Sequence, residues 1–286
     1  MKIVHIPDGF LSTPVWVTLD AAAAPAIGYL ASRAQKGFEQ SQAPLLGVMG
    51  AFVFAAQMIN FPVGAGTTGH LLGGALLAMT LGPVSASIVM TAILAIQALV
   101  FQDGGILALG ANVVNMALAG VLAGYLPFAL WGTTSWRRIA LFAGGALSVL
   151  VSAILALSEL LISGVPMSGR MVGASVAVFL VSAVLEGAIT LAVIESLERI
   201  QPKLVRRPSR RTSPVLGVVA VAAVLLASVG VLFASEAPDA IQRLTHQTIS
   251  EASGWPTKSL TGLAGIALIY GACLLFARVA ARRRSV

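Results

Sequence analysis

Long uninterrupted runs of apolar residues constrain the fold of this chain more than any motif in it. Of its 286 residues, 57% are hydrophobic and only 10% are charged, whereas a soluble domain carries roughly 25% charged residues. Apolar runs of about 17–25 residues are long enough to cross the hydrocarbon core of a bilayer as helices. We therefore predict an all-α fold, a polytopic membrane helix bundle.

Nine apolar runs are candidates for transmembrane helices. The third run is short and rich in glycine, which also fits a half-span or a re-entrant segment. In chain order the predicted spans are residues 14–32, 45–59, 70–82, 84–101, 107–130, 138–163, 171–197, 215–234 and 259–280.

Clusters of basic residues indicate the orientation, because Lys and Arg accumulate on the cytoplasmic side of a membrane. With nine spans, all four clusters lie on one side, which predicts an N-terminus outside and a C-terminus inside. The net charge of +7 is then a topology signal rather than a nucleic-acid-binding surface. The clusters are Arg33 with Lys36, Arg137 with Arg138, Lys203 to Arg211, and Arg282 to Arg284.

A polar, basic and proline-rich segment at residues 201–213 predicts a cytoplasmic linker. It separates a seven-span body, residues 1–200, from a two-helix tail, residues 214–286. Residues 1–13 do not form a cleavable signal peptide, because Pro7, Asp8 and Gly9 interrupt the segment where an apolar core would begin. We predict an ordered loop there, outside the membrane.

Two of the three histidines lie in unusual stretches, and the predicted topology brings both to the outer membrane surface. His5 begins the run His-Ile-Pro-Asp-Gly-Phe-Leu, and His70 follows the glycine-rich segment 64–69. Neutral imidazoles are ligands for nickel, copper, zinc and iron. The alternative is that each histidine only caps a loop by hydrogen bonding.

Polar residues inside apolar spans are costly, and they often have a function. Glu186 lies in the middle of a span, and Asn112 and Asn115 are three residues apart, which would place them on one face of an α-helix. For each of these residues a structural role in hydrogen bonding between helices is the alternative, and we favour that role for Gln97. The further candidates are Gln57, Asn60 and Asp103.

Enzyme motifs do not occur in the sequence. There is no Gly-x-Ser-x-Gly, no His-Glu-x-x-His and no phosphate-binding Gly-x-x-x-x-Gly-Lys-Ser/Thr. The only cysteine, Cys273, lies in an apolar run, which excludes a thiolate cluster. We predict that the chain is not an enzyme and does not itself hydrolyse ATP.

Five motifs resemble those of the substrate-binding M component of cobalt/nickel energy-coupling-factor transporters, the CbiM/NikM family. They occur in the order expected for the family between residues 5 and 200. The tail resembles the N component of these transporters less closely, since Pro238-Asp-Ala-Ile-Gln stands where that family has Pro-Asp-Gly-Leu-Glu. The five motifs are His5-Ile-Pro-Asp-Gly-Phe-Leu, Gln57-Met-Ile-Asn-Phe-Pro-Val, Gly66-Thr-Thr-Gly-His-Leu-Leu-Gly-Gly, Phe101-Gln-Asp-Gly-Gly and Gly110-Ala-Asn-Val-Val-Asn-Met.

The resemblance implies a division of labour in the bacterial inner membrane. This chain would capture Ni²⁺ or Co²⁺ as the transported substrate, without a resident cofactor. A separate transmembrane T component and a pair of ATP-binding cassette ATPases would drive its release inward, in the cobalt case for cobalamin biosynthesis. The small residues Ala21 to Ala26 of the first span would allow close packing against the T component.

The resemblance also implies an ion site of four nitrogens. In the family these are the terminal amine, the amide and imidazole of the histidine that follows the initiator Met, and a second histidine. Here the two histidines are His5 and His70. Gln57, Asn60, Thr67 and Thr68 are candidates for supporting the imidazoles, because a metal-bound imidazole uses its other ring nitrogen for a hydrogen bond.

The residues that precede His5 depart from this pattern, because Met1-Lys-Ile-Val places the amine three residues too far upstream. We expect translation to start at codon 4, which a GTG codon would allow. The alternative is that backbone amides of Ile3 or Val4 replace the amine. N-terminal sequencing distinguishes the two, since Lys2 in the mature chain excludes the later start.

The sequence is also compatible with two other functions. A metal-independent channel or scaffold would use the same polar groups. A vitamin-binding S component would share the architecture, although such proteins bind through aromatic pockets and residues 57–75 contain few aromatics. Nickel and cobalt are not separated by the sequence, and the fusion of the two parts favours nickel by analogy only.

Overall fold

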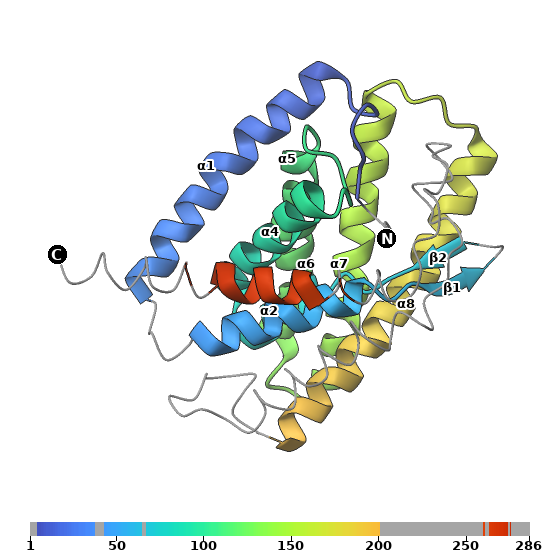
Figure 1. Cartoon of the computed structure of the whole chain (residues 1–286). Coiled ribbons are helices and arrows are strands. Elements are labelled where there is room, and N and C mark those ends of the chain that lie inside the picture. Colours follow the sequence, from blue (N-terminus) through green and yellow to red (C-terminus); the bar gives the residue numbers. More distant parts are fainter. Residues whose placement is uncertain are drawn as a thin grey trace.

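The computed structural model describes residues 5–37, 43–64, 67–200, 260, 263–273 and 275. It is a helical bundle with one short hairpin (Figure 1). The predicted linker 201–213, the predicted span 215–234 and residues 1–4 lie outside the described residues. The helices are α1 (Thr13–Gly37), α2 (Ala43–Gln57), α3 (Gly74–Leu81), α4 (Pro83–Val100), α5 (Leu109–Asn112), the π-helix η2 (Val113–Gly120), α6 (Val121–Trp131), α7 (Arg137–Ile162), α8 (Gly169–Ile200) and a C-terminal helix, Leu263–Cys273.

Five helical segments in the described residues are long and apolar enough to cross a membrane. They are residues 13–35, 83–100, 109–131, 137–162 and 169–200. Each matches a predicted span to within a few residues. Two shorter apolar helices, Ala43–Gln57 and Leu263–Cys273, overlap two more predicted spans, residues 45–59 and 259–280. A multi-pass membrane bundle is thus supported, whereas the count of nine spans and the orientation of the termini stay predictions.

The predicted third span, residues 70–82, is not a full transmembrane helix. Residues 70–73 are non-helical and buried, and α3 has only eight residues, about 12 Å of helix against a hydrocarbon core of about 30 Å. Gly82 ends α3 with a φ of +80°, and Pro83 starts α4 at the next residue. This part of the chain is therefore compatible with the half-span or re-entrant segment that the glycine-rich sequence suggested.

A β-hairpin was not expected from the all-α prediction. β1 (Phe61–Gly64) and β2 (Thr67–Gly69) pair antiparallel with an irregular register between Pro62 and Gly64. The hairpin contacts α8, and Figure 1 shows it at the edge of that helix. It delivers the chain to His70, immediately after β2.

The centre of the bundle is formed by α3, α4, the α5–η2–α6 segment, α7 and α8. The most extensive packing is that of α7 against α8 and α6. Gly145 on α7 allows this close approach, because a Cβ there would lie 2.8 Å from the Gly187 Cα. At the start of α7, Arg137 and Arg138 form ion pairs with Glu198 and Glu195 of α8, which fixes the two helices at one end of the bundle.

The prediction that Asn112 and Asn115 share one helical face is wrong, because residues 113–120 form a π-helix. A π-helix turns the chain by a different angle per residue than an α-helix. Asn112 consequently binds the N-terminal segment at Ile6, whereas Asn115 binds Glu159 on α7.

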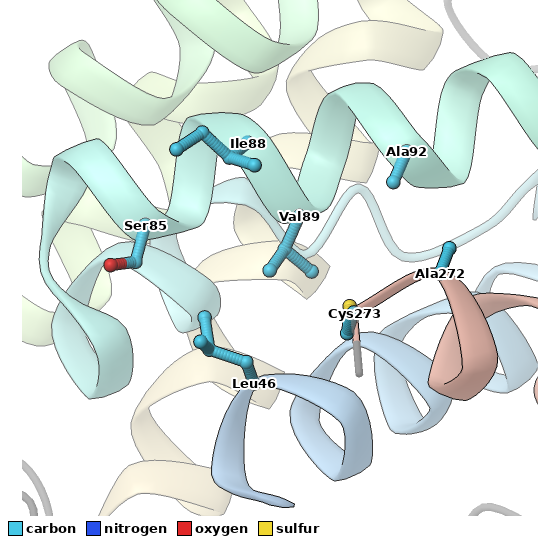
Figure 2. Close-up of a pocket in the computed structure, with 7 residues that line it drawn as sticks. All are labelled: Leu46, Ser85, Ile88, Val89, Ala92, Ala272 and Cys273. Atoms are coloured by element: carbon cyan, nitrogen blue, oxygen red, sulfur yellow. The ribbon is translucent and has the colours of Figure 1, made fainter. Parts of the chain in front are cut away.

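The C-terminal helix packs against α2 through glycines of both helices. A Cβ at Gly265 would overlap the Phe54 ring, and a Cβ at Gly50 would lie 3.0 Å from Ile269. Cys273 is buried in this contact. Figure 2 shows it in a small apolar pocket between Leu46 of α2 and Val89 of α4. Part of the predicted tail thus lies directly on the body of the protein.

Replacing Gly265 by Leu is expected to loosen this contact and expose Cys273. Overpacking costs about 1–3 kcal/mol, so the rate at which a maleimide modifies the only cysteine should rise about tenfold. Gly271→Leu is the matched control, because a Cβ at Gly271 meets no atom within 4 Å. Equal modification rates in wild type and Gly265→Leu would contradict the packing.

Candidate ion-binding site

His5 is fully buried against the loop between α4 and α5. Its Nδ1 lies 3.1 Å from Oδ1 of Asp103. The Asp103 amide in turn donates to the carbonyl of Gln97 at the end of α4, at 2.9 Å. The loop reaches this geometry through positive φ angles at Gln102 and Gly104. Nε2 of His5 is buried and has no hydrogen-bond partner among the described residues, so within this part of the chain one ring nitrogen is available to a ligand.

The segment that carries His5 is anchored through its backbone. The Ile6 amide donates to Oδ1 of Asn112 at 2.8 Å, and Nδ2 of Asn112 donates to the Ile6 carbonyl at 3.1 Å. Gly105 also donates to that carbonyl, at 2.9 Å. Asn112 thus fixes the position of His5, which gives it a structural role beside the site.

Two carboxylates that are not among the predicted site residues hold the same loop. Asp8 accepts the amides of Ile106 and Leu107 at 2.9 and 2.8 Å, and Asp20 of α1 accepts the amide of Gly110 at 2.6 Å. Both sit at the positive N-terminal end of α5, where anions are stabilised. The sequence signal for this contact is the single carboxylate, Asp20, within an apolar span. The sequence does not show its partner, because Gly110 is 90 residues away.

His70 is buried beside His5, with the two ring centroids 5.7 Å apart. Its Nδ1 donates to the carbonyl of Leu71 at 2.8 Å, so Nε2 carries the lone pair. His70 precedes α3 and lies outside the helices. Burial, reinforced by the nearby charge of His5, lowers the pKa of His70 to about 3. The imidazole is therefore neutral at neutral pH, the form that binds metals.

The backbone after His70 is held by buried polar groups from three helices. Glu186 of α8 accepts the amides of Leu72 and Gly73, at 2.7 and 2.8 Å. Gln57 of α2 donates to the Leu72 carbonyl at 2.7 Å, and Gln97 of α4 donates to Gln57 at 2.9 Å. Gln97 is an interhelical hydrogen-bond donor, as expected, and it also connects the two histidine loops.

Asp103 supplies a negative charge next to both imidazoles. Burial acts to raise the pKa of its carboxyl, but the neighbouring groups together, His5 foremost, lower the pKa to about 2. The carboxylate is thus ionised at neutral pH, and its Oδ2 is buried with no hydrogen-bond partner in the part of the chain that the structure describes. Such a site attracts a cation.

Three other predicted residues lie between Gln57 and His70 in the chain. Asn60 is half-buried between α2 and β1, and no described residue hydrogen-bonds to it. Thr68 is buried in β2. The side chain of Thr67 lies outside the described set.

The spacing of the two histidines suits a shared ion. A metal about 2 Å from a nitrogen of each ring can bridge imidazoles whose centroids are up to about 6 Å apart. Among the described residues no group of three or more His, Cys, Asp and Glu side chains forms a ligand set. A four-ligand site would therefore need backbone or terminal nitrogens, and residues 1–4 lie outside the described part.

The chelate implied by the resemblance makes a specific demand on His5. A six-membered ring through its own amide uses Nδ1, the nitrogen that faces Asp103 here. Formation of that chelate requires the His5 imidazole to leave Asp103 for the ion.

Comparison with known proteins identifies transport proteins. Residues 5–204 match the family model described as the cobalt uptake substrate-specific transmembrane region. A putative metal transport protein of Haloquadratum walsbyi is 38% identical over 71% of this chain and 93% of its own length. A probable fused nickel transport protein of Lactiplantibacillus plantarum is 32% identical over 86% of this chain and 82% of its own length.

Solved structures share the fold. A crystal structure of a transition metal transporter is 33% identical, with a TM-score of 0.60, and the match covers 68% of this chain and 93% of that one. A truncated transition metal transporter is 35% identical, with a TM-score of 0.57, over 68% of this chain and 98% of that one.

Proposed function

This chain belongs to the cobalt uptake substrate-specific transmembrane family, and from that premise we propose that it captures Ni²⁺ or Co²⁺ from outside the cell for import. Membership of this family shows that the chain is a membrane component of a cobalt/nickel transporter. The ion, its site and the direction of capture are the proposal.

The observation that carries the proposal is the pair of buried imidazoles beside an ionised carboxylate. His5 and His70 come from segments 65 residues apart, yet their rings lie 5.7 Å from each other. Each ring has a nitrogen oriented by a neighbour, Asp103 or the Leu71 carbonyl. Metal-binding histidines are oriented in this way. We propose that both imidazoles bind the ion.

An outward-facing site is supported by the contacts at the two ends of the 109–131 span. At its start Asn112 holds Ile6 next to His5, and at its end Gly132 accepts a hydrogen bond from Arg137. The site therefore lies at the end away from the Arg137–Arg138 cluster. Because basic clusters mark the cytoplasmic side, the histidines face outward in the inner membrane.

The proposal also includes partner subunits and a role for residues 214–286. We propose that a T component and an ATPase pair supply the energy, as the family resemblance implies; the chain itself has no phosphate-binding loop. Relatives named as fused nickel transport proteins support an N-component-like role for residues 214–286. Calorimetric titration of the purified chain with Ni²⁺, Co²⁺ and Mg²⁺ tests the proposal, since the nitrogen ligands predict binding of the first two ions only.

Asp103→Asn is expected to weaken Ni²⁺ binding about tenfold, because loss of the partner that orients a ligating histidine typically costs 10–100-fold in affinity. The substitution also removes the only negative charge described next to His5. Calorimetry on the purified variant measures the change, with Glu195→Gln on the far end of α8 as the control. Tighter binding would mean that Asp103 competes with the ion for His5, and unchanged affinity would mean that it does not support the site.

A further inference from the structure

The bundle contains a buried carboxylate that the proposed ion site does not use. Glu159, near the end of α7, accepts a hydrogen bond from Nδ2 of Asn115 at 2.8 Å. Glu159 is 7% exposed and Asn115 is fully buried. The C-terminal end of a helix is its negative pole, so α7 itself does not stabilise an anion there. An acidic group buried in a membrane bundle suggests a function.

The partner of Glu159 belongs to the π-helix η2. π-helices are rare and occur frequently at functional sites. The hydroxyl of Ser152, two turns before Glu159 on α7, donates to the carbonyl of Asn115 at 2.8 Å. At the end of η2, a Cβ on Gly120 would lie 3.3 Å from the Ser148 carbonyl. One face of α7 therefore contacts three groups of η2: the Asn115 side chain, the Asn115 carbonyl and Gly120.

The start of η2 is tied to the ion site. Asn112 is the last residue of α5, and η2 begins at the next residue. The Asn112 amide group pairs with both backbone groups of Ile6, and Ile6 is adjacent to His5. If η2 became an α-helix, the angle about the helix axis between the side chains of Asn112 and Asn115 would change. With Asn115 held on α7, Asn112 would then no longer point at Ile6.

We propose that Glu159 is a positioning residue for the ion site. By holding Asn115 it keeps η2 in the π-helical register, and this register sets Asn112 against Ile6 and places His5 beside His70. The contacts run from Glu159 through Asn115 and Asn112 to Ile6. The inference rests on the proposed function, since it assigns Glu159 to the binding of the same ion.

The test compares Glu159→Ala with Glu159→Gln in the purified full chain, using Ni²⁺ calorimetry and thermal melting. Glu159→Ala is expected to weaken Ni²⁺ binding about tenfold, because the loss of a residue that positions a metal-binding side chain lowers metal affinity by about that factor. Glu159→Gln keeps an acceptor oxygen for Asn115 and should restore binding to within about threefold. Glu195→Ala, a partly exposed carboxylate on α8, is the matched control and should bind as wild type.

A double variant separates positioning from general stabilisation. Once Asn112→Ala has removed the contact with Ile6, Glu159→Ala should add little further loss of affinity, because residues of one network are non-additive. Fully additive losses would show that Glu159 only stabilises the bundle, and would overturn the inference. Ser152→Ala, a milder change to the same contact, should weaken binding severalfold if Glu159→Ala does not fold.

The outcomes separate this inference from the function on which it rests. If wild type binds Ni²⁺ and Glu159→Ala binds it equally well, the positioning role is excluded and the ion site stands. If wild type binds neither Ni²⁺ nor Co²⁺, the proposed function itself is excluded.

Discussion

His70→Ala is expected to lower the affinity for Ni²⁺ and Co²⁺ by more than about 100-fold, because loss of a supporting partner alone costs 10–100-fold and His70 is proposed as a ligand. The neutral imidazole is buried 5.7 Å from His5, and no other described His or Cys side chain joins the two in a ligand set. Calorimetry measures the binding, and uptake of radioactive ⁶³Ni²⁺ by cells that express the complete transporter measures the transport.

The sequence offers a matched control for this substitution. His246 is the remaining histidine, and the family motifs do not include it, so His246→Ala should bind and transport as wild type. A metal-independent channel or scaffold predicts that His70→Ala behaves in the same way as His246→Ala. Equal affinities for the two variants would therefore reject the site.

Glu186→Leu is expected to have the second largest effect. It removes the acceptor of two buried amides, at Leu72 and Gly73, and each unsatisfied group costs about 1–3 kcal/mol. The backbone that follows His70 loses its anchor on α8, so we expect a lower melting temperature together with at least about tenfold weaker Ni²⁺ binding. Thermal melting and calorimetry on the same preparation measure both.

Two further variants make the Glu186 prediction specific. Glu186→Gln retains one carbonyl oxygen and should show a smaller loss of both quantities. Glu195→Leu makes the same change on the same helix at a partly exposed ion pair with Arg138, and exposed pairs contribute little. Wild-type stability and affinity in Glu186→Leu would show that the two hydrogen bonds do not hold the site.

The transmembrane helices were predictable because each depends on local composition. The predicted span 138–163 differs by one residue at each end from α7, since Arg137 and Ser163 bound its apolar run. The predicted span 70–82 has a weaker local signal, because glycines interrupt its apolar run. The structure resolves it into a non-helical segment and α3.

The two histidines were predictable as candidates, but their proximity was not. Sequence and topology placed them on one side of the membrane, whereas the 5.7 Å between their rings depends on Asn112, Asp103 and Glu186, which act across about 100 residues. Such long-range contacts leave no local pattern. The same holds for η2, because its π register is accompanied by contacts with α7 that a window of sequence does not contain.

The most direct test of the central claim is X-ray absorption spectroscopy of the Ni²⁺-loaded chain. The claim predicts a nitrogen shell near 2 Å with the multiple-scattering signal of two imidazoles in wild type and of one in His70→Ala. A tetragonal geometry would indicate the four-nitrogen chelate, in which His5 binds through Nδ1 and has moved away from Asp103. A shell of oxygens without imidazole scattering, or a sulfur shell, would contradict the assignment of His5 and His70 as ligands.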